Sequence, residues 1–243
     1  MSTIQELIEG FLYPHLEKYT ACVYKYGEDT VIKGIRVLDD PSKFTHGALV
    51  KATAMLYTHY EKNGDPRADE ALKRLNDAIR LASGTVCKTW GKLGVLRGIN
   101  LLYENHLLHK VDKNLIEQVK VRTEYDDFLD KESLTLKGMA NNYYQVAMAC
   151  AGYRERFGWE NDGIAERIKE KFTKIIIEDS PQGWMDDEPP YGRFDRYSLI
   201  LSSEFYDTAT DISLEAPKEI IDNLRSAANV ALFMANDRGD GVD

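Results

Sequence analysis

Two kinds of hydrophobic pattern alternate along this chain. In the first kind, small and aromatic residues dominate and no helical face carries much charge, which is typical of helices buried on most sides. These segments are 44–60, 90–109, 138–156 and 197–210. In the second kind, apolar residues recur at helical spacing opposite a charged face. These segments are 66–82, 113–129, 163–177 and 215–235. The pattern predicts low-charge helices that alternate with amphipathic ones.

The alternation repeats about every 47 residues, a spacing typical of stacked helical hairpins. Links from a low-charge helix to the next amphipathic one are short, and links in the other direction are longer. We therefore expect an all-α fold of antiparallel helical hairpins in an (α/α) toroid or open arc, or an incomplete (α/α)6 barrel. An N-terminal helix over 4–19, bent at Pro14, precedes the hairpins. Strand patterns are nearly absent, except for a short one within 30–38.

We expect one helical domain of about nine helices over residues 1–243, or the N-terminal part of a longer protein. No apolar run approaches the length of a membrane span, and no signal peptide is visible, so the prediction is a cytoplasmic protein. The formal net charge of −9 disfavours nucleic acid and anionic membranes as partners. Cys22, Cys87 and Cys150 are scattered, which argues against disulfides and structural zinc.

Residues 183–198 form the least core-like stretch of the chain. They combine proline, glycine, arginine, aromatic and carboxylate residues between two predicted helices. Links between helices are usually two to eight residues long, and longer ones tend to be functional. Rings for stacking and charges for orientation favour a loop that lines a carbohydrate site.

The motifs here resemble those of a known group of proteins. They are Gly183-Trp184, Asp186-Asp187, the run from Tyr191 to Ser198, and Gly239-Asp240-Gly241-Val242. They resemble (α/α)-toroid proteins of bacteria and fungi, many of unknown function, that are related to heparinase-like and alginate-lyase-like polysaccharide lyases. The likeness covers residues 138–243. The chain departs from that pattern at Arg196, where the relatives have Tyr, in lacking their later Gly-Arg-Ser turn, and in lacking their His within 198–205.

The resemblance implies β-elimination on a uronic-acid-containing oligo- or polysaccharide. That reaction needs a group that neutralises the substrate carboxylate, a base for the C5 proton and an acid for the leaving oxygen. The catalytic candidates are Asn142, Tyr143, Arg193, Tyr197, Asp186 and Asp187. The substrate-binding candidates are His46, Trp90, Asn141, Trp184, Tyr191 and Asp195. No cofactor and no metal are implied, and the oligomeric state is left open.

Each of these residues also has a structural explanation. Asn141 and Asn142 stand where helix caps are common, and one of Tyr143 and Tyr144 is expected in the core. The aspartates of the loop could cap turns or pair with its arginines, Trp184 could anchor the loop, and a lone histidine such as His46 is more often structural.

Two other functions stay open. Asp186, Asp187 and Asp195 favour a glycoside hydrolase, because a pair of carboxylates can run acid–base hydrolysis; the resemblance to toroidal proteins implies the unsaturated-glucuronyl type. A non-catalytic helical-repeat binding module, or an inactive fragment, is the third reading.

The acidic run 126–130 contains the Asp-Asp-x-x-Asp pattern of metal-dependent terpene cyclases. Those enzymes need a second metal-binding motif, and the segment that begins one at Asp222 has Val230 where an acidic residue is required. The sequence therefore predicts a solvated helix end at 126–130.

Overall fold

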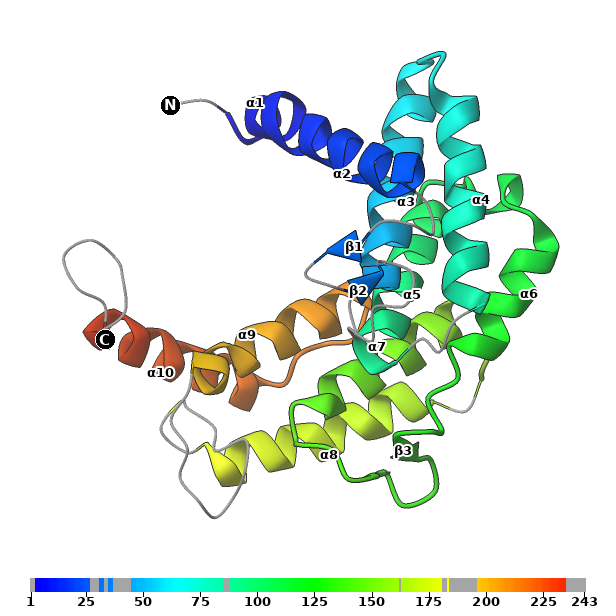
Figure 1. The fold of residues 1–243 in the computed structure, drawn as a ribbon. Helices are drawn as coiled ribbons and strands as arrows, with labels where there is room; N and C mark the ends of the chain where they lie inside the picture. Colours follow the sequence, from blue (N-terminus) through cyan, green and yellow to red (C-terminus); the bar gives the residue numbers. More distant parts are fainter. Residues whose placement is uncertain are drawn as a thin grey trace. The chain divides into compact units, whose positions relative to one another are not determined.

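The computed structural model describes residues 3–26, 31–32, 35–36, 45–84, 88–161, 163–180, 183 and 196–234. Most of these residues are helical, which confirms the all-α class (Figure 1). The chain divides into two compact units, Met1–Glu124 and Tyr125–Asp243, each of which is described by itself. The expectation of one domain with its hairpins in a toroid or arc stays a prediction.

The first unit contains helices and one short pair of strands. They are α1 (Ile4–Leu7), η1 (Ile8–Leu12), α2 (Tyr13–Tyr26), β1 (Val31–Ile32), β2 (Ile35–Arg36), α3 (Thr45–Asn63), α4 (Ala68–Gly84), α5 (Thr89–Glu104), η4 (Leu108–Lys110) and α6 (Lys113–Arg122). The strands β1 and β2 pair antiparallel with Val31 opposite Arg36, within the range where the sequence allowed a short strand. The helices agree with the predicted alternation.

The N-terminal helix is continuous across Pro14 and contains one π-helical turn, η1. The amide of Tyr13 donates to the carbonyl of Ile8, five residues earlier. Proline has no amide hydrogen to donate to the preceding turn, and a wider π turn just before it accommodates that loss. A π-helical turn thus directly precedes Pro14, and π turns and prolines are both places where helices bend.

Glycines let α3 and α5 pack backbone to backbone. A Cβ on Gly47 would lie 2.5 Å from the carbonyl oxygen of Gly91, and one on Gly94 would lie 2.8 Å from the Cα of Gly47. Further along, Gly98 lies against Val50 and Lys51. Residue numbers rise together on both helices, so α3 and α5 run in the same direction, with α4 returning between them in the sequence.

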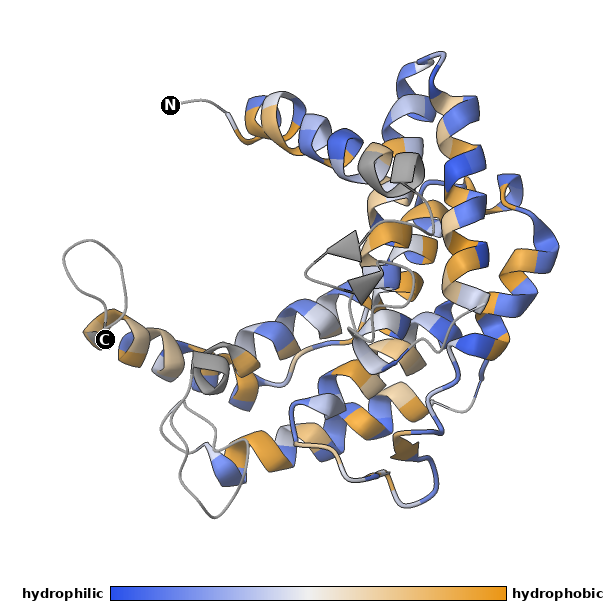
Figure 2. Ribbon diagram, viewed as in Figure 1, coloured by the Kyte–Doolittle hydropathy of each residue, from blue (hydrophilic) through white to orange (hydrophobic). Residues whose placement is uncertain are grey.

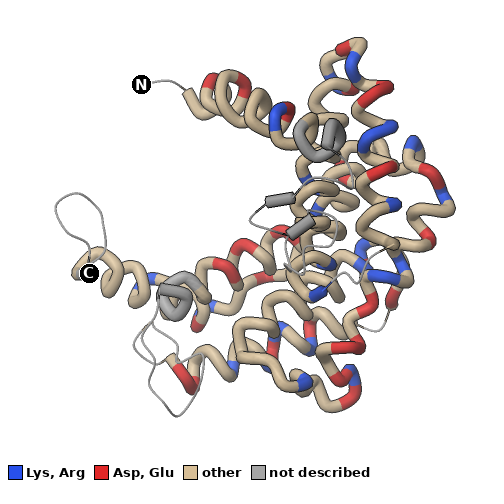
Figure 3. The backbone as a smooth tube through the Cα atoms, in the orientation of Figure 1, with Lys and Arg blue, Asp and Glu red and all other residues tan. Residues whose placement is uncertain are grey.

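The amphipathic helices cover the low-charge ones as their patterns predict. The residues that α4 buries recur every three or four positions: Ala71, Leu75, Ala78, Ile79, Ala82 and Ser83. Figure 2 shows the resulting alternation of orange and blue along α4 and α8. Charged residues occur throughout α4 and α8, whereas those of α7 are confined to its last turn (Figure 3).

The second unit begins with a small hairpin and continues with two helical hairpins. Its elements are β3 (Leu129–Asp130), β4 (Thr135–Leu136), α7 (Tyr143–Arg156), α8 (Ile164–Asp179), α9 (Arg196–Asp211) and α10 (Lys218–Met234). The Phe172 ring joins the core, with centroids 5.7 Å from Tyr144 and 5.4 Å from Phe205. Contacts of Gln145 with Thr208 and of Tyr153 with Asp211 show that α7 and α9 run in the same direction.

The predicted helix over 113–129 is wrong beyond Arg122. The chain leaves the helix at Thr123, whose hydroxyl donates to the carbonyl of Val119 at 2.7 Å. The acidic run 126–130 therefore lies in a turn and in β3, which pairs antiparallel with β4, and forms no helix end. Asp130 accepts the backbone amide of Ser133 at 2.8 Å and fixes the tip of this hairpin.

Candidate functional site

Half of the candidate residues lie outside the described part of the chain. These are Trp184, Asp186, Asp187, Tyr191, Arg193 and Asp195. Tyr197 belongs to the first turn of α9, and its side chain is outside the described part. Asn141, Asn142, Tyr143, His46 and Trp90 are described. The structure places the first three at the start of α7 and the other two in the first unit.

The asparagines at the start of α7 are not helix caps of the usual kind. Asn142 occupies the N-cap position, yet its side chain makes no capping hydrogen bond. The amide of Asn141 donates instead to Oδ2 of Asp179, at the end of α8, over 3.2 Å. The capping explanation thus does not hold for Asn142, and Asn141 joins the start of one helix to the end of the next.

The two tyrosines that follow have different environments. Tyr144 is 4% exposed and its hydroxyl donates to the carbonyl of Leu134 at 2.9 Å. Tyr143 is only partly buried. This confirms that one of the pair belongs to the core, and it identifies that residue as Tyr144.

The end of α8 at Ser180 is anchored by a buried polar cluster. Asn223 of α10 donates to the carbonyl of Ser180 at 2.6 Å, and Ser202 of α9 donates to Oδ1 of the same asparagine at 2.5 Å. All three side chains are buried. Buried polar groups are costly unless they are hydrogen-bonded, so this cluster fixes the end of α8 against α9 and α10.

Gly183 fixes the chain a few residues further on. Its φ is +91°, and a Cβ there would lie 2.3 Å from the backbone nitrogen of Ala227 on α10. Only glycine combines this backbone conformation with so close an approach. The sequence singled out Gly183 as part of a motif, and the structure gives the physical reason for it.

The end of α8 and the start of α9 lie at the end of the second unit where α7 also begins. Asn141 reaches the end of α8, and α9 runs in the direction of α7 from Arg196. We call Asn141, Asn142, Tyr143 and Asp179 the α7 rim. Two helix N-termini point the same way here, and helix N-termini favour negative charge. Asp179 adds a carboxylate of its own to this rim, and Asn141 donates to it.

His46 and Trp90 occupy equivalent places on neighbouring helices. Each is the second residue of its helix, in Thr45-His46-Gly47 on α3 and Thr89-Trp90-Gly91 on α5. Because Gly47 packs against Gly91, the starts of the two helices lie side by side. His46 is 7% exposed, and Trp90 is partly buried.

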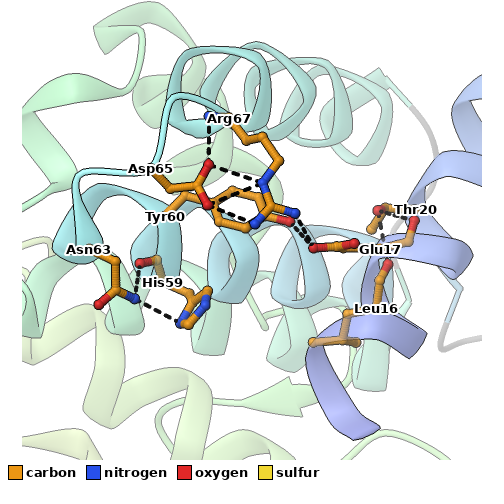
Figure 4. A network of polar contacts seen from close by, with 8 residues as sticks. All are labelled: Leu16, Glu17, Thr20, His59, Tyr60, Asn63, Asp65 and Arg67. Carbon is orange, nitrogen blue, oxygen red and sulfur yellow. Dashed lines mark hydrogen bonds and ion pairs between the residues drawn. The ribbon is translucent and has the colours of Figure 1, made fainter. Parts of the chain in front are cut away.

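Sequence reasoning missed a polar network at the opposite end of α3 (Figure 4). Arg67 bonds Asp65 and Glu17, each at 2.7 Å, and its guanidinium lies 4.3 Å from the ring centre of Tyr60. The Tyr60 hydroxyl donates to Oε1 of Glu17. Glu17 stands 43 residues from Tyr60 and 50 from Arg67, so no local sequence pattern could join them.

The network shifts the titration of its members. Burial, and then the hydrogen bond to Glu17, raises the pKa of Tyr60 above its usual value. Hydrogen bonds from Arg67 lower the pKa of Asp65 to about 2. Tyr60 therefore stays neutral and Asp65 stays charged across the physiological range. The bonds of Glu17 with Tyr60 and Arg67 tie α2 to the α3–α4 hairpin.

No protein-family model matches this chain, and neither a curated protein nor a solved structure matches it. The likeness to toroidal polysaccharide lyases stays a prediction. Among the described helices, none has both the length and the apolar character that a membrane crossing requires. Within the described ranges, no three His, Cys, Asp or Glu side chains are grouped to hold a metal ion.

Proposed function

We propose that this chain is a carbohydrate-active enzyme that cleaves uronic-acid-containing oligosaccharides by β-elimination. The observation that carries the proposal is the α7 rim: Asn142 stands at a helix start without capping it, where residues 181–195 leave α8. We propose further that the hairpins continue one another in an (α/α) toroid or open arc, which would put the starts of the low-charge helices on one working face.

The proposed roles follow from the chemistry of the step. Neutralising the substrate carboxylate makes the C5 proton more acidic, and Asn142 and Arg193 are the groups assigned to that task. A tyrosine in its phenolate form then takes the C5 proton, the C4–C5 double bond forms, the C4–O bond breaks, and a neutral tyrosine protonates the departing oxygen. Tyr143 and Tyr197 are the residues assigned to these proton transfers. The N-termini of α7 and α9 add favourable potential for the carboxylate.

The test is an ultraviolet assay of the full chain on alginate, hyaluronate, heparin and polygalacturonate, and on their unsaturated oligosaccharides. A lyase creates the absorbing unsaturated uronate, so absorbance should rise. A fall with the unsaturated oligosaccharides, lost in Asp186→Asn or Asp187→Asn, would replace the lyase by the hydrolase. No change with any substrate would reject both enzymes in favour of a binding module.

A matched pair of variants separates catalysis from folding. Tyr143→Phe and Tyr144→Phe remove the same hydroxyl from adjacent residues, one at the α7 rim and one bonded to Leu134 in the core. The proposal expects Tyr143→Phe to lower the rate by about 10²-fold or more, as for a lost acid–base group, with little change in stability. Tyr144→Phe should cost stability of about 1 kcal/mol and leave the rate of the folded enzyme unchanged.

A further inference from the structure

A pocket of about 240 Å³ lies between α2, α3 and α4 of the first unit, beside the polar network of Figure 4. It is smaller than the roughly 300–1,000 Å³ of sites for drug-sized ligands, so its occupant must be small. The residues that line it differ in exposure. Thr20, Thr53, Leu56 and Ala71 are buried and form its inner wall.

The inner wall is mostly apolar, although it contains two threonines. The hydroxyl of Thr20 donates to the carbonyl of Leu16 at 2.9 Å, and that of Thr53 donates to the carbonyl of Leu49 at 2.8 Å. Both hydroxyls are thus bonded to their own helices. With Leu56 and Ala71, the wall suits a hydrocarbon body, because such a body gains free energy when it leaves water for this surface.

The rim of the pocket is charged and has a net negative charge. Glu17, Arg67, Glu70 and Arg74 line it, and Asp65 is bonded to Arg67. Three carboxylates therefore surround two guanidinium groups. Arg67 is held by two of these carboxylates, and Arg74 bonds Glu70 at 3.0 Å. A cationic ligand is favoured over an anionic one, because an anion would have to displace an existing ion pair.

One oxygen of Glu17 is placed to receive that cation. The Tyr60 hydroxyl and Nη1 of Arg67 both donate to Oε1. Among the described residues, none donates a hydrogen bond to Oε2 of Glu17. The two donors orient the carboxylate of Glu17, which lines the pocket, and leave Oε2 as the oxygen that can accept from a ligand. A pre-positioned charged acceptor binds a donor without first losing its own freedom of rotation.

We propose that this pocket binds a small organic cation, an ammonium group on an aromatic or aliphatic body of about ten non-hydrogen atoms. The ammonium group donates to Oε2 of Glu17, and the body lies against Thr53, Leu56 and Ala71. The proposal concerns the first unit alone and does not depend on the carbohydrate chemistry proposed for the second.

The experiment is a calorimetric titration of the full chain with phenethylammonium chloride. Two ligands of similar shape, neutral 2-phenylethanol and anionic 3-phenylpropionate, serve as controls for charge. We expect saturable binding of the ammonium compound with a dissociation constant below about 1 mM, and at least tenfold weaker binding of the other two. Equal binding of all three, or no binding of the ammonium compound, would overturn the proposal.

Variants locate the site. Glu17→Gln keeps the shape of the side chain but removes its charge, and should weaken binding by about tenfold or more, as for the loss of a charged hydrogen bond. Ala71→Leu fills the inner wall and should abolish binding while leaving Glu17 in place. Glu9→Gln is the matched control, because Glu9 is an exposed residue of the same helical segment outside the pocket. Unchanged affinity in both Glu17→Gln and Ala71→Leu, each verified as folded by its thermal transition, would refute the assignment.

Discussion

Replacing Gly94 by alanine tests the packing of α3 against α5, on which the hairpin repeat of the first unit rests. The added Cβ would lie 2.8 Å from the Cα and the carbonyl carbon of Gly47. Ordinary contacts of this kind begin at 3.4 Å, so the two backbones must separate by the difference, about 0.6 Å. A backbone cannot rotate out of the way as a side chain can, and the neighbouring core contacts must loosen with it.

The expected magnitude follows from two opposing terms. Overpacking a well-packed core costs about 1–3 kcal/mol, and contact with backbone on the facing helix places Gly94 at the upper end of that range. Alanine is better than glycine in a helix interior by about 1 kcal/mol. The net effect should be a loss of about 2 kcal/mol in the free energy of unfolding.

Two glycines of the same unit provide controls with the same chemical change. A Cβ on Gly98 would meet a methyl group of Val50 at 3.0 Å, and one on Gly84 would meet nothing within 4 Å. Urea unfolding followed by far-ultraviolet circular dichroism should therefore rank the variants Gly84→Ala, Gly98→Ala, Gly94→Ala in order of decreasing stability. If Gly94→Ala were as stable as Gly84→Ala, the close parallel contact of α3 and α5 would be refuted.

Three further predictions concern the anchors described above. Gly183→Ala should destabilise the second unit by about 2 kcal/mol or more, since it adds strain at a positive φ to an overlap with the backbone of Ala227; an unchanged urea midpoint would contradict this. Asn223→Ala should cost about 1–3 kcal/mol, because it removes the buried hydrogen bonds that Asn223 makes with Ser180 and Ser202, and a loss below the error of the urea measurement would count against the buried cluster. The pKa of Asp65 is lowered in the folded state to about 2, so its contribution to stability is complete above about pH 4 and is lost as the pH falls through about 2. Asp65→Asn should accordingly flatten the dependence of the unfolding free energy on pH in that window, and a slope equal to that of the unchanged protein would show that Asp65 is not the group responsible.

The helices could be predicted because their hydrophobic pattern is local. The low-charge segments became α3, α5, α7 and α9, and the amphipathic ones became α4, α6, α8 and α10. The prediction of a helix failed beyond Arg122, where a residue distant in the sequence determines the local structure. Tyr125 is fully buried and its hydroxyl donates to Glu160 at 2.9 Å, 35 residues away. That contact favours a turn at a place where the hydrophobic pattern alone predicts that the helix continues.

The candidate site was predictable to a similar extent. His46 and Trp90 occupy equivalent positions of the sequence repeat, and the starts of their parallel helices lie side by side. The repeat could not tell which of Tyr143 and Tyr144 faces inward, since either side of a low-charge helix can be buried. The link between Glu17 and Arg67 was also out of reach, because it joins residues 50 positions apart and neither has a distinctive local motif.

The central claim is that Asn142, at the start of α7, belongs to a site that acts on acidic sugars. The most direct test compares the initial rate of unsaturated-uronate formation by the unchanged protein and by Asn142→Ala, at equal folded fraction, on each of the four uronic-acid-containing polymers. We predict that at least one polymer is cleaved, and that the variant is slower by about 10²–10³-fold, as when a group that stabilises developing negative charge is lost. Equal rates for the two proteins, or no product from any polymer, would contradict the claim.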